Sequence, residues 1–186
     1  MIFHNCPLPS VYTIELEKRE DKRGFFAHTF CVDEFRSRGL AYNIVQINNS
    51  LSADRGTLRG MHYQLPPHAE TKIVRCICGS LWDCVLDLRE RSPTFGQWFG
   101  AELSADNRRM MYVPKGCAHG FITLEDQTEA FYIVDEVYAP RQERGVRYND
   151  LRFSIQWPIV PTCISEKDQG HPDFDWDYHL RVGRGL

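Results

Sequence analysis

The side chains best suited to chemistry lie in residues 56–64, where Arg59 and His62 stand three positions apart. An imidazole can exchange a proton near neutral pH, and a guanidinium can bind an anion. The apolar and aromatic residues around them are typical of a strand. Alternation sends residues three apart to opposite faces, so both can serve one pocket only if Gly60 marks a bulge or twist. The alternative is that His62 is an ordinary hydrogen-bonded histidine of the core.

Alternation directs further polar groups toward the interior. In residues 71–78, Lys72 shares a face with an apolar set, Val74, Cys76 and Cys78. In residues 128–138, Tyr132 and Tyr138 have the same parity, so both phenols can face one cavity. The alternatives are a lysine that reaches solvent from a strand end and tyrosines that belong to an aromatic core.

A carboxylate that could orient a histidine occurs near the end of the chain. Residues 165–168 read Ser-Glu-Lys-Asp, inside a segment from about residue 158 that has no periodicity. We expect this segment to be irregular and to pack back on the rest of the protein. The pattern alone does not show that Asp168 reaches His62.

The elements that must position these groups are mostly short strands separated by turns. Alternating or aromatic-rich patterns predict strands at residues 11–16, 24–30, 43–51, 57–64, 71–78, 81–89, 97–103, 109–113, 120–124, 128–138 and 152–157. Residues 17–23 are expected to be a charged turn. Residues 32–38 are the best helix candidate, with Asp33 as its cap and Gly39 at its end. Many short strands and few helical patterns favour an all-β sandwich or barrel.

Length and charge limit the classes of function. A chain of 186 residues, 42% of them hydrophobic, is long enough for one substantial core, so we expect a single domain over residues 1–186. A net charge of −3 argues against nucleic acid or an anionic membrane surface as the partner. The first residues lack the pattern of a secretory leader, and the expected location is the cytoplasm.

The seven cysteines are an odd number. In a cytoplasmic protein the expectation is reduced, half-buried thiols and no disulfide framework. The spacing of Cys76, Cys78 and Cys84 matches no zinc pattern, and we expect no metal there.

Several ordered motifs carry a resemblance that covers nearly the whole chain. They are RGFF at 23–26, VQ at 45–46, LRGMHYQ at 58–64, KIVR at 72–75, SPTFG at 92–96, VPKGCAHGF at 113–121 and YND at 148–150. On these motifs the chain closely resembles the dTDP-4-dehydrorhamnose 3,5-epimerase family, which belongs to the cupin superfamily. The resemblance implies a jelly roll, or double-stranded β-helix, with few short helices.

The same resemblance implies partners and cofactors. It implies a homodimer in which N-terminal strands join the partner's sheet, and a substrate that is a nucleotide-diphosphate sugar. It also implies a site with no metal and no cofactor. The sequence agrees, because cupin metal sites use a His-x-His pair and this chain has Gln64 two residues after His62.

The resemblance assigns roles by position. His62 matches the family's catalytic base, Asp168 the carboxylate that orients it, Tyr132 the acid on the opposite face, and Lys72 the residue beside the sugar's keto oxygen. The positions expected to contact substrate are Arg23, His28, Gln46, Asn48, Arg59, His119, Tyr138, Glu143 and Lys167.

These residue types suit an epimerase. A ketone at C4 acidifies the hydrogens at C3 and C5, and removal of one leaves an enolate that the Lys72 ammonium can stabilise. Inversion then needs one base and one acid on opposite walls, here His62 and Tyr132. The expected function is epimerisation at C3, C5 or both of a nucleotide-diphosphate 4-keto-6-deoxyhexose.

Three positions depart from the family pattern. His28 replaces an acidic residue, Ile47 replaces an aspartate, and Tyr148 replaces the commoner tryptophan. His28 and Ile47 fall where the nucleotide end is expected, which leaves open a CDP-linked or other nucleotide sugar. Two more distant alternatives are a metal-dependent cupin oxygenase and a sugar-binding jelly roll without catalysis.

Overall fold

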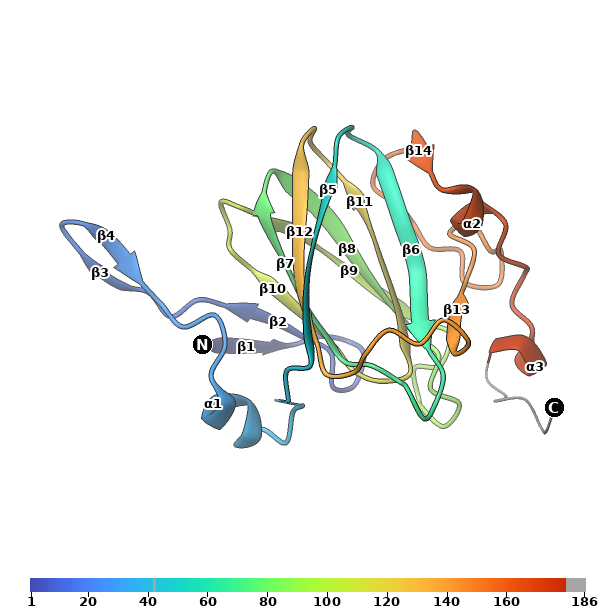
Figure 1. Ribbon diagram of the computed structural model, residues 1–186, viewed down its shortest axis with the longest axis horizontal. Helices are drawn as coiled ribbons and strands as arrows, with labels where there is room; N and C mark the ends of the chain where they lie inside the picture. The colour runs from blue at the N-terminus through green and yellow to red at the C-terminus, as the bar shows by residue number, and fades with distance from the viewer. Residues whose placement is uncertain (42, 180–186) are drawn as a thin grey trace.

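The computed structural model describes residues 1–41 and 43–179, and most of its strands form two facing, mainly antiparallel sheets (Figure 1). The single domain expected over residues 1–186 includes residue 42 and residues 180–186, which lie outside the described residues. The prediction of an all-β protein with few short helices is confirmed.

The first sheet has six strands, and β5 is its last strand on one side. Their order is β1 (Ile2–Asn5), β2 (Tyr12–Glu15), β10 (Met110–Val113), β7 (Lys72–Cys78), β12 (Thr128–Val134) and β5 (Gln46–Ser52). The predicted strand at 128–138 ends four residues early, so Tyr138 lies beyond β12 and strand parity does not place it. The expectation that Tyr132 and Tyr138 face one cavity is nevertheless confirmed, since both line the same cavity.

The second sheet faces the first and is covered on its outer side by the end of the chain. Its order is β13 (Glu143–Gly145), β6 (Thr57–Gln64), β11 (Cys117–Thr123), β8 (Ser80–Asp87) and β9 (Trp98–Ser104), and β14 (Cys163–Ile164) pairs in parallel with β6. Cys84, Leu86 and Leu88 pack outward against Phe153 and Ile155. The predicted strand at 152–157 was wrong, because these residues form turns and loops that cover the sheet.

The inner faces of the two sheets share a hydrophobic core. Val74, Cys76 and Met111 of the first sheet pack with Leu81 and Val85 of the second. Cys78 was predicted to share this face, but it is exposed, because a register shift opposite Glu129 and Ala130 turns the end of β7 outward. All seven cysteines are free thiols, as expected, but only Cys6 and Cys31 are half-buried, since three others are buried and two are exposed.

An arm stands away from the sheets near the start of the chain. It is the hairpin of β3 (Arg19–Asp21) and β4 (Gly24–Phe26), drawn in blue in Figure 1, whose residues are all exposed. Residues 17–23 are therefore not simply a turn. The helix that follows, α1 (Val32–Arg36), has Cys31 and not Asp33 as its N-cap.

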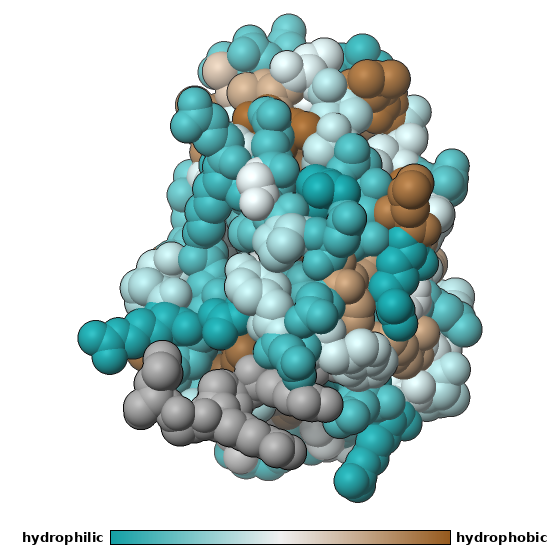
Figure 2. Space-filling view, turned by 90° about the vertical axis from the view of Figure 1, so that its right-hand side faces the viewer, coloured by the Kyte–Doolittle hydropathy of each residue, from teal (hydrophilic) through white to brown (hydrophobic). Residues whose placement is uncertain are grey.

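The segment after residue 158 is only partly irregular. Besides β14 it contains α2 (Glu166–Gln169) and α3 (Trp176–His179). The face that carries these elements is mostly hydrophilic, with separated hydrophobic patches (Figure 2). Across residues 1–41 and 43–179, no helix is long and apolar enough to span a membrane.

One buried carboxylate fixes the β8–β9 connection. Asp87 is fully buried and accepts hydrogen bonds from Arg89, Ser92 and Thr94. Burial opposes its ionisation, but these hydrogen bonds outweigh burial and lower the pKa of Asp87 to about 2.

We predict that Asp87→Asn lowers the free energy of unfolding by about 3 kcal/mol at pH 7, because it leaves Arg89 and two hydroxyls poorly paired. A depressed pKa contributes stability above the unfolded pKa of about 4, and this contribution disappears as the pH falls toward 2. The difference from wild type should therefore shrink between pH 5 and 2, as measured by urea unfolding. A constant difference would contradict this account, and Asp106→Asn, at an exposed position, is the control.

Candidate active site

A β-bulge in β6 turns Arg59 and His62 to the same side. His62 lies opposite His119 and Arg59 lies opposite Phe121, so two residues of β6 face one residue of β11. Gly60 has φ of 116°, and a Cβ there would lie 2.6 Å from the Cα of Gly120. The bulge predicted at Gly60 is confirmed, and only glycine suits this backbone and this close approach.

Two adjoining cavities, of about 440 and about 270 Å³, open between the sheets and share His62, Lys72 and Tyr132 in their walls. The larger cavity is also lined by Arg59, His119, Phe121, Lys167 and Asp168. The smaller one is also lined by Gln46, Asn48, Glu70, Tyr138 and Glu143. Eleven of the thirteen residues expected from the sequence thus line one cavity or both.

His62 is held by a buried carboxylate from the end of the chain. Its Nε2 lies 2.6 Å from Oδ1 of Asp168, whose side chain is 5% exposed. Asp168 also accepts a hydrogen bond from the Gly60 N–H, and its own N–H donates to Ser165, the N-cap of α2. The carboxylate is therefore fixed from both β6 and α2.

The charge on Asp168 determines which nitrogen of His62 is free. Burial opposes ionisation of Asp168, but the neighbouring rings of His171 and His62 and the Gly60 N–H outweigh it, so the pKa of Asp168 lies well below its usual range. An ionised carboxylate can only accept, so Nε2 of His62 must carry a proton. In neutral His62 the other nitrogen, Nδ1, is then free to take up a proton.

The opposite wall carries Tyr132 and Lys72, on β12 and β7 of the first sheet. Lys72 is 12% exposed, and its Nζ lies 3.0 Å from Glu70. Burial and the charge of Glu70 raise the pKa of Tyr132, and Arg59 partly offsets them. The phenol is consequently protonated at neutral pH and can donate a proton.

His119 lies beside His62 on the next strand and is oriented by another buried carboxylate. Its Nε2 lies 2.7 Å from Oδ2 of Asp83, which is fully buried. His119 also lines the larger cavity.

A charged network joins the two cavities at Glu143, which accepts hydrogen bonds from Lys167 at 2.6 Å and Tyr138 at 2.7 Å. Burial opposes ionisation, but these two hydrogen bonds lower the pKa of Glu143. Further hydrogen bonds lie in each cavity: Gln46 donates to Asn48 in the smaller one. In the larger one, Arg59 donates to Ser52 and to the Leu51 carbonyl.

Two expected site residues lie away from both cavities. Arg23 is on the arm, where it pairs with Asp21, and its side chain is 83% exposed. His28 follows the arm and lies 3.8 Å from Glu34. Ile47 was also placed at the nucleotide end, but it is 54% exposed and alternation directs it away from Gln46 and Asn48.

Sequence reasoning missed four residues that shape the site: Glu70, Asp83, Ser165 and His171. Asp83 is fully buried on β8 and contacts His119 of the neighbouring strand, and no local pattern predicted this contact. His171 is buried against Gly145, and its Nε2 lies 3.8 Å from Asp168. The available signal for Ser165 was the Ser-x-x-Asp spacing of a helix cap.

Two groups among the described residues have three ligand atoms within 4.8 Å of one another, as a bound metal would need. One is His62, Asp168 and His171, and the other is His28, Cys31 and Glu34. Gln64, at the place of the second histidine in a cupin metal motif, is buried and hydrogen-bonded to the backbone of His68, Val137 and Ala139.

Comparisons with known proteins agree with this geometry. The sequence model described as dTDP-4-dehydrorhamnose 3,5-epimerase matches residues 5–175. A dTDP-4-dehydrorhamnose 3,5-epimerase of Shigella flexneri is 41% identical over 175 residues, which cover 93% of this chain and 96% of the relative.

Solved structures are similar to this chain in both sequence and fold. The crystal structure of dTDP-4-dehydrorhamnose 3,5-epimerase from Elizabethkingia anophelis has a TM-score of 0.90 at 42% identity, covering 94% of this chain and 96% of that one. The dTDP-6-deoxy-D-glucose-3,5-epimerase of Legionella pneumophila, in complex with dTDP-4-keto-L-rhamnose, has a TM-score of 0.88 at 33% identity and 98% coverage of both chains. The predicted jelly roll is confirmed, and this chain belongs to the dTDP-4-dehydrorhamnose 3,5-epimerase family.

Proposed function

We propose that this protein is a 3,5-epimerase of a dTDP-linked 4-keto-6-deoxyhexose in deoxysugar biosynthesis. The observation that carries the proposal is the placement of His62 with Asp168 on the second sheet and of Tyr132 on the first, across one cavity. A base and an acid on opposite walls are what inversion of a C–H centre requires.

In the proposed reaction, Nδ1 of His62 removes the proton at C3 or C5. The electrons of that C–H bond form a C=C bond, and those of the C4 carbonyl move onto its oxygen. Lys72 stabilises this enolate oxygen, since its ammonium lies in a largely buried site. Tyr132 then donates its proton to the carbon from the other face, and solvent later restores both groups.

The two cavities suit the two ends of such a substrate. The larger one, with Phe121 and the reactive groups, would take the sugar, and the smaller one would take the nucleotide near Tyr138 and Gln46. Arg59 and Lys167 supply cations for the diphosphate. We assign no cofactor to this reaction, because the ketone itself acidifies the hydrogens.

We also propose that the site is completed by a partner chain in a cytoplasmic homodimer, each chain acting as one domain. All residues of the two strands of the arm are exposed, and an isolated hairpin is only marginally stable in water. It exposes Phe25 and Phe26, while Ile47 and Leu51 are exposed on β5, the last strand of the first sheet. An arm added beside β5 of the partner would bring Arg23 and His28 close to the smaller cavity.

We predict that His62→Ala lowers kcat/KM by 10² or more, because a general base contributes about that factor. Deuterium from deuterated water should no longer enter C3 or C5 of dTDP-4-dehydro-6-deoxyglucose, as read by mass spectrometry and NMR. His4→Ala, which removes a histidine from the far edge of the first sheet, is the control. Exchange at a near wild-type rate in His62→Ala would remove this residue as the base. In wild type, exchange at C3 alone would identify a single-centre epimerase.

Tyr132→Phe should separate exchange from inversion. The phenol is assigned to reprotonation only, so deuterium entry from the original face should persist in part while net inversion falls steeply. Both rates can be followed in the same NMR experiment, with Tyr12→Phe as the control outside the cavities. Equal losses of exchange and inversion would contradict this division of roles.

Coexpression of two impaired variants tests the exchanged arm. Arg23→Ala should lower kcat/KM about tenfold or more by removing a charged contact to substrate. If the arm serves the partner, a mixed dimer of Arg23→Ala and His62→Ala holds one intact site. Half of the dimers are then mixed, and activity should recover to about a quarter of wild type. Coexpressed His62→Ala and Asp168→Ala, which share one site, should not recover. Activity no higher than the sum of the separate variants would refute the exchange.

A further inference from the structure

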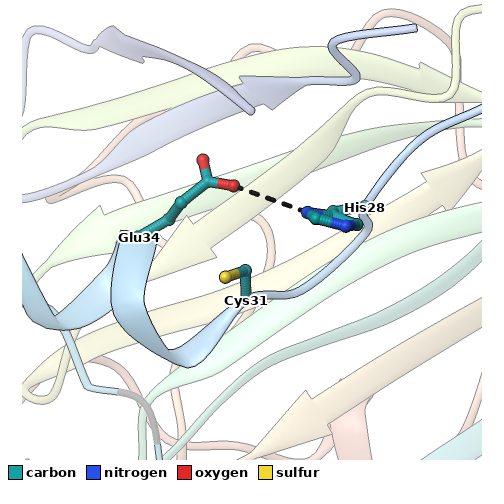
Figure 3. A group of neighbouring side chains, drawn as sticks. All are labelled: His28, Cys31 and Glu34. Carbon is teal, nitrogen blue, oxygen red and sulfur yellow. Dashed lines mark ion pairs between the residues drawn. The ribbon is translucent and has the colours of Figure 1, made fainter. Parts of the chain in front are cut away.

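A second cluster of side chains lies at the base of the arm, outside the site described above. His28 follows β4, Cys31 precedes α1, and Glu34 lies in the first turn of that helix. Figure 3 shows the three side chains turned toward one another, with an ion pair between His28 and Glu34. The spacing is three residues at each step, which brings side chains of a loop and a helical turn to one side.

The distances are close to those of a metal site. The ligand atoms of the three residues lie within 4.8 Å of one another, and Nδ1 of His28 lies 3.8 Å from Oε1 of Glu34. In tetrahedral zinc sites, bonds of about 2.0–2.1 Å put a nitrogen and an oxygen ligand roughly 3.3–3.4 Å apart, and a thiolate bond of about 2.3 Å puts the sulfur roughly 3.5 Å from either. The His28–Glu34 separation of 3.8 Å is thus about 0.4 Å too wide, and the Cys31 sulfur has to move by roughly 1.3 Å at most.

The ligand types select the class of metal. Imidazole, thiolate and carboxylate together are the donors of borderline-soft divalent ions such as Zn²⁺, whereas Mg²⁺ and Ca²⁺ prefer oxygen alone. Thiolate and carboxylate also balance the charge of the ion. The Cys31 thiol makes no capping hydrogen bond to α1, although it occupies the N-cap position.

Other charged groups face Glu34 and would compete with a metal ion for its carboxylate. Oε2 of Glu34 lies 2.8 Å from the Met1 ammonium, which also pairs with Glu17. The hydrogen bond from the Met1 ammonium lowers the pKa of the Glu34 carboxyl and outweighs the opposing effect of burial, and the charges of Arg38 and His28 add to the lowering. The Met1 ammonium contacts Oε2, so Oε1 remains directed at His28.

We propose that His28, Cys31 and Glu34 form a binding site for a divalent transition-metal ion of the Zn²⁺ class. Binding replaces the Cys31 thiol proton, which passes to solvent, and leaves a fourth position for water. The ion ties His28 to α1 and so fixes the direction in which the arm leaves the first sheet. The Nε2 atom of His28 remains available for another contact.

The test is Zn²⁺ binding to the metal-stripped full-length protein, measured by competition with a chromogenic chelator. It is made in wild type and in Asp168→Asn, because His62, Asp168 and His171 form the other group able to hold an ion. Both proteins should bind one Zn²⁺ per chain at this cluster. Cys31→Ser and Glu34→Gln should each weaken that binding at least tenfold, and Cys78→Ser and Cys163→Ser, at exposed thiols, should not.

Co²⁺ gives a second readout that identifies the ligand. Wild type should show thiolate-to-cobalt charge-transfer absorption, and Cys31→Ser should lose it. Zn²⁺ should raise the melting temperature of wild type and not of Cys31→Ser. A metal-free melting curve of Cys31→Ser checks that this variant folds. Binding and absorption unchanged in Cys31→Ser, or no Zn²⁺ binding by wild type beyond that of Cys31→Ser, would overturn the proposal. None of these measurements uses the sugar substrate, so the outcome is independent of the proposed epimerase activity.

Discussion

The contact between the buried Asp168 carboxylate and His62 is the interaction on which the rest of the site depends. A carboxylate with so little exposure is stable as an anion only if several donors surround it, because an unpaired buried charge costs several kcal/mol. The protein supplies these donors from the Gly60 N–H and the His62 ring. The pairing of β14 with β6 brings α2 close enough to deliver Asp168, which explains why the last segment of the chain folds back over the sheet.

The two sheets divide the proposed chemistry between them. His62 and His119 are neighbours on the second sheet, each oriented by its own buried aspartate, whereas Lys72 and Tyr132 lie on the first. All four side chains are carried by strands and not by loops, so their separation is set by the packing of the core. Glu70 contributes twice, since it pairs with Lys72 and raises the pKa of Tyr132.

Local periodicity predicted the parts of this site that lie within regular strands. The inward direction of Lys72 followed from alternation. Alternation required a bulge at Gly60 only if Arg59 and His62 share one pocket, which they do. The same rule failed for Cys78, where a register shift interrupts the alternation. It did not place Tyr138, which lies beyond the end of β12 although it lines a cavity together with Tyr132.

The long-range contacts of the site could not be predicted from the local sequence pattern. The motif resemblance named Asp168, but no pattern in residues 158–179 showed that it would meet His62 more than 100 residues earlier. Glu70 and His171 act through neighbours that only the tertiary fold provides. The arm is similar: its sequence predicted a turn and a strand, but not a hairpin that stands away from the sheets.

The tautomer of His62 tests the central claim most directly. Nitrogen-15 NMR of the histidine rings in the protein without substrate should show a protonated Nε2 and an unprotonated Nδ1 for His62, assigned by its loss in His62→Ala. In Asp168→Asn this single tautomer should give way to a mixture, because the amide can both donate and accept. A proton on Nδ1 in wild type, with Nε2 free, would contradict the account, since the nitrogen facing the substrate would then have no capacity to remove a proton.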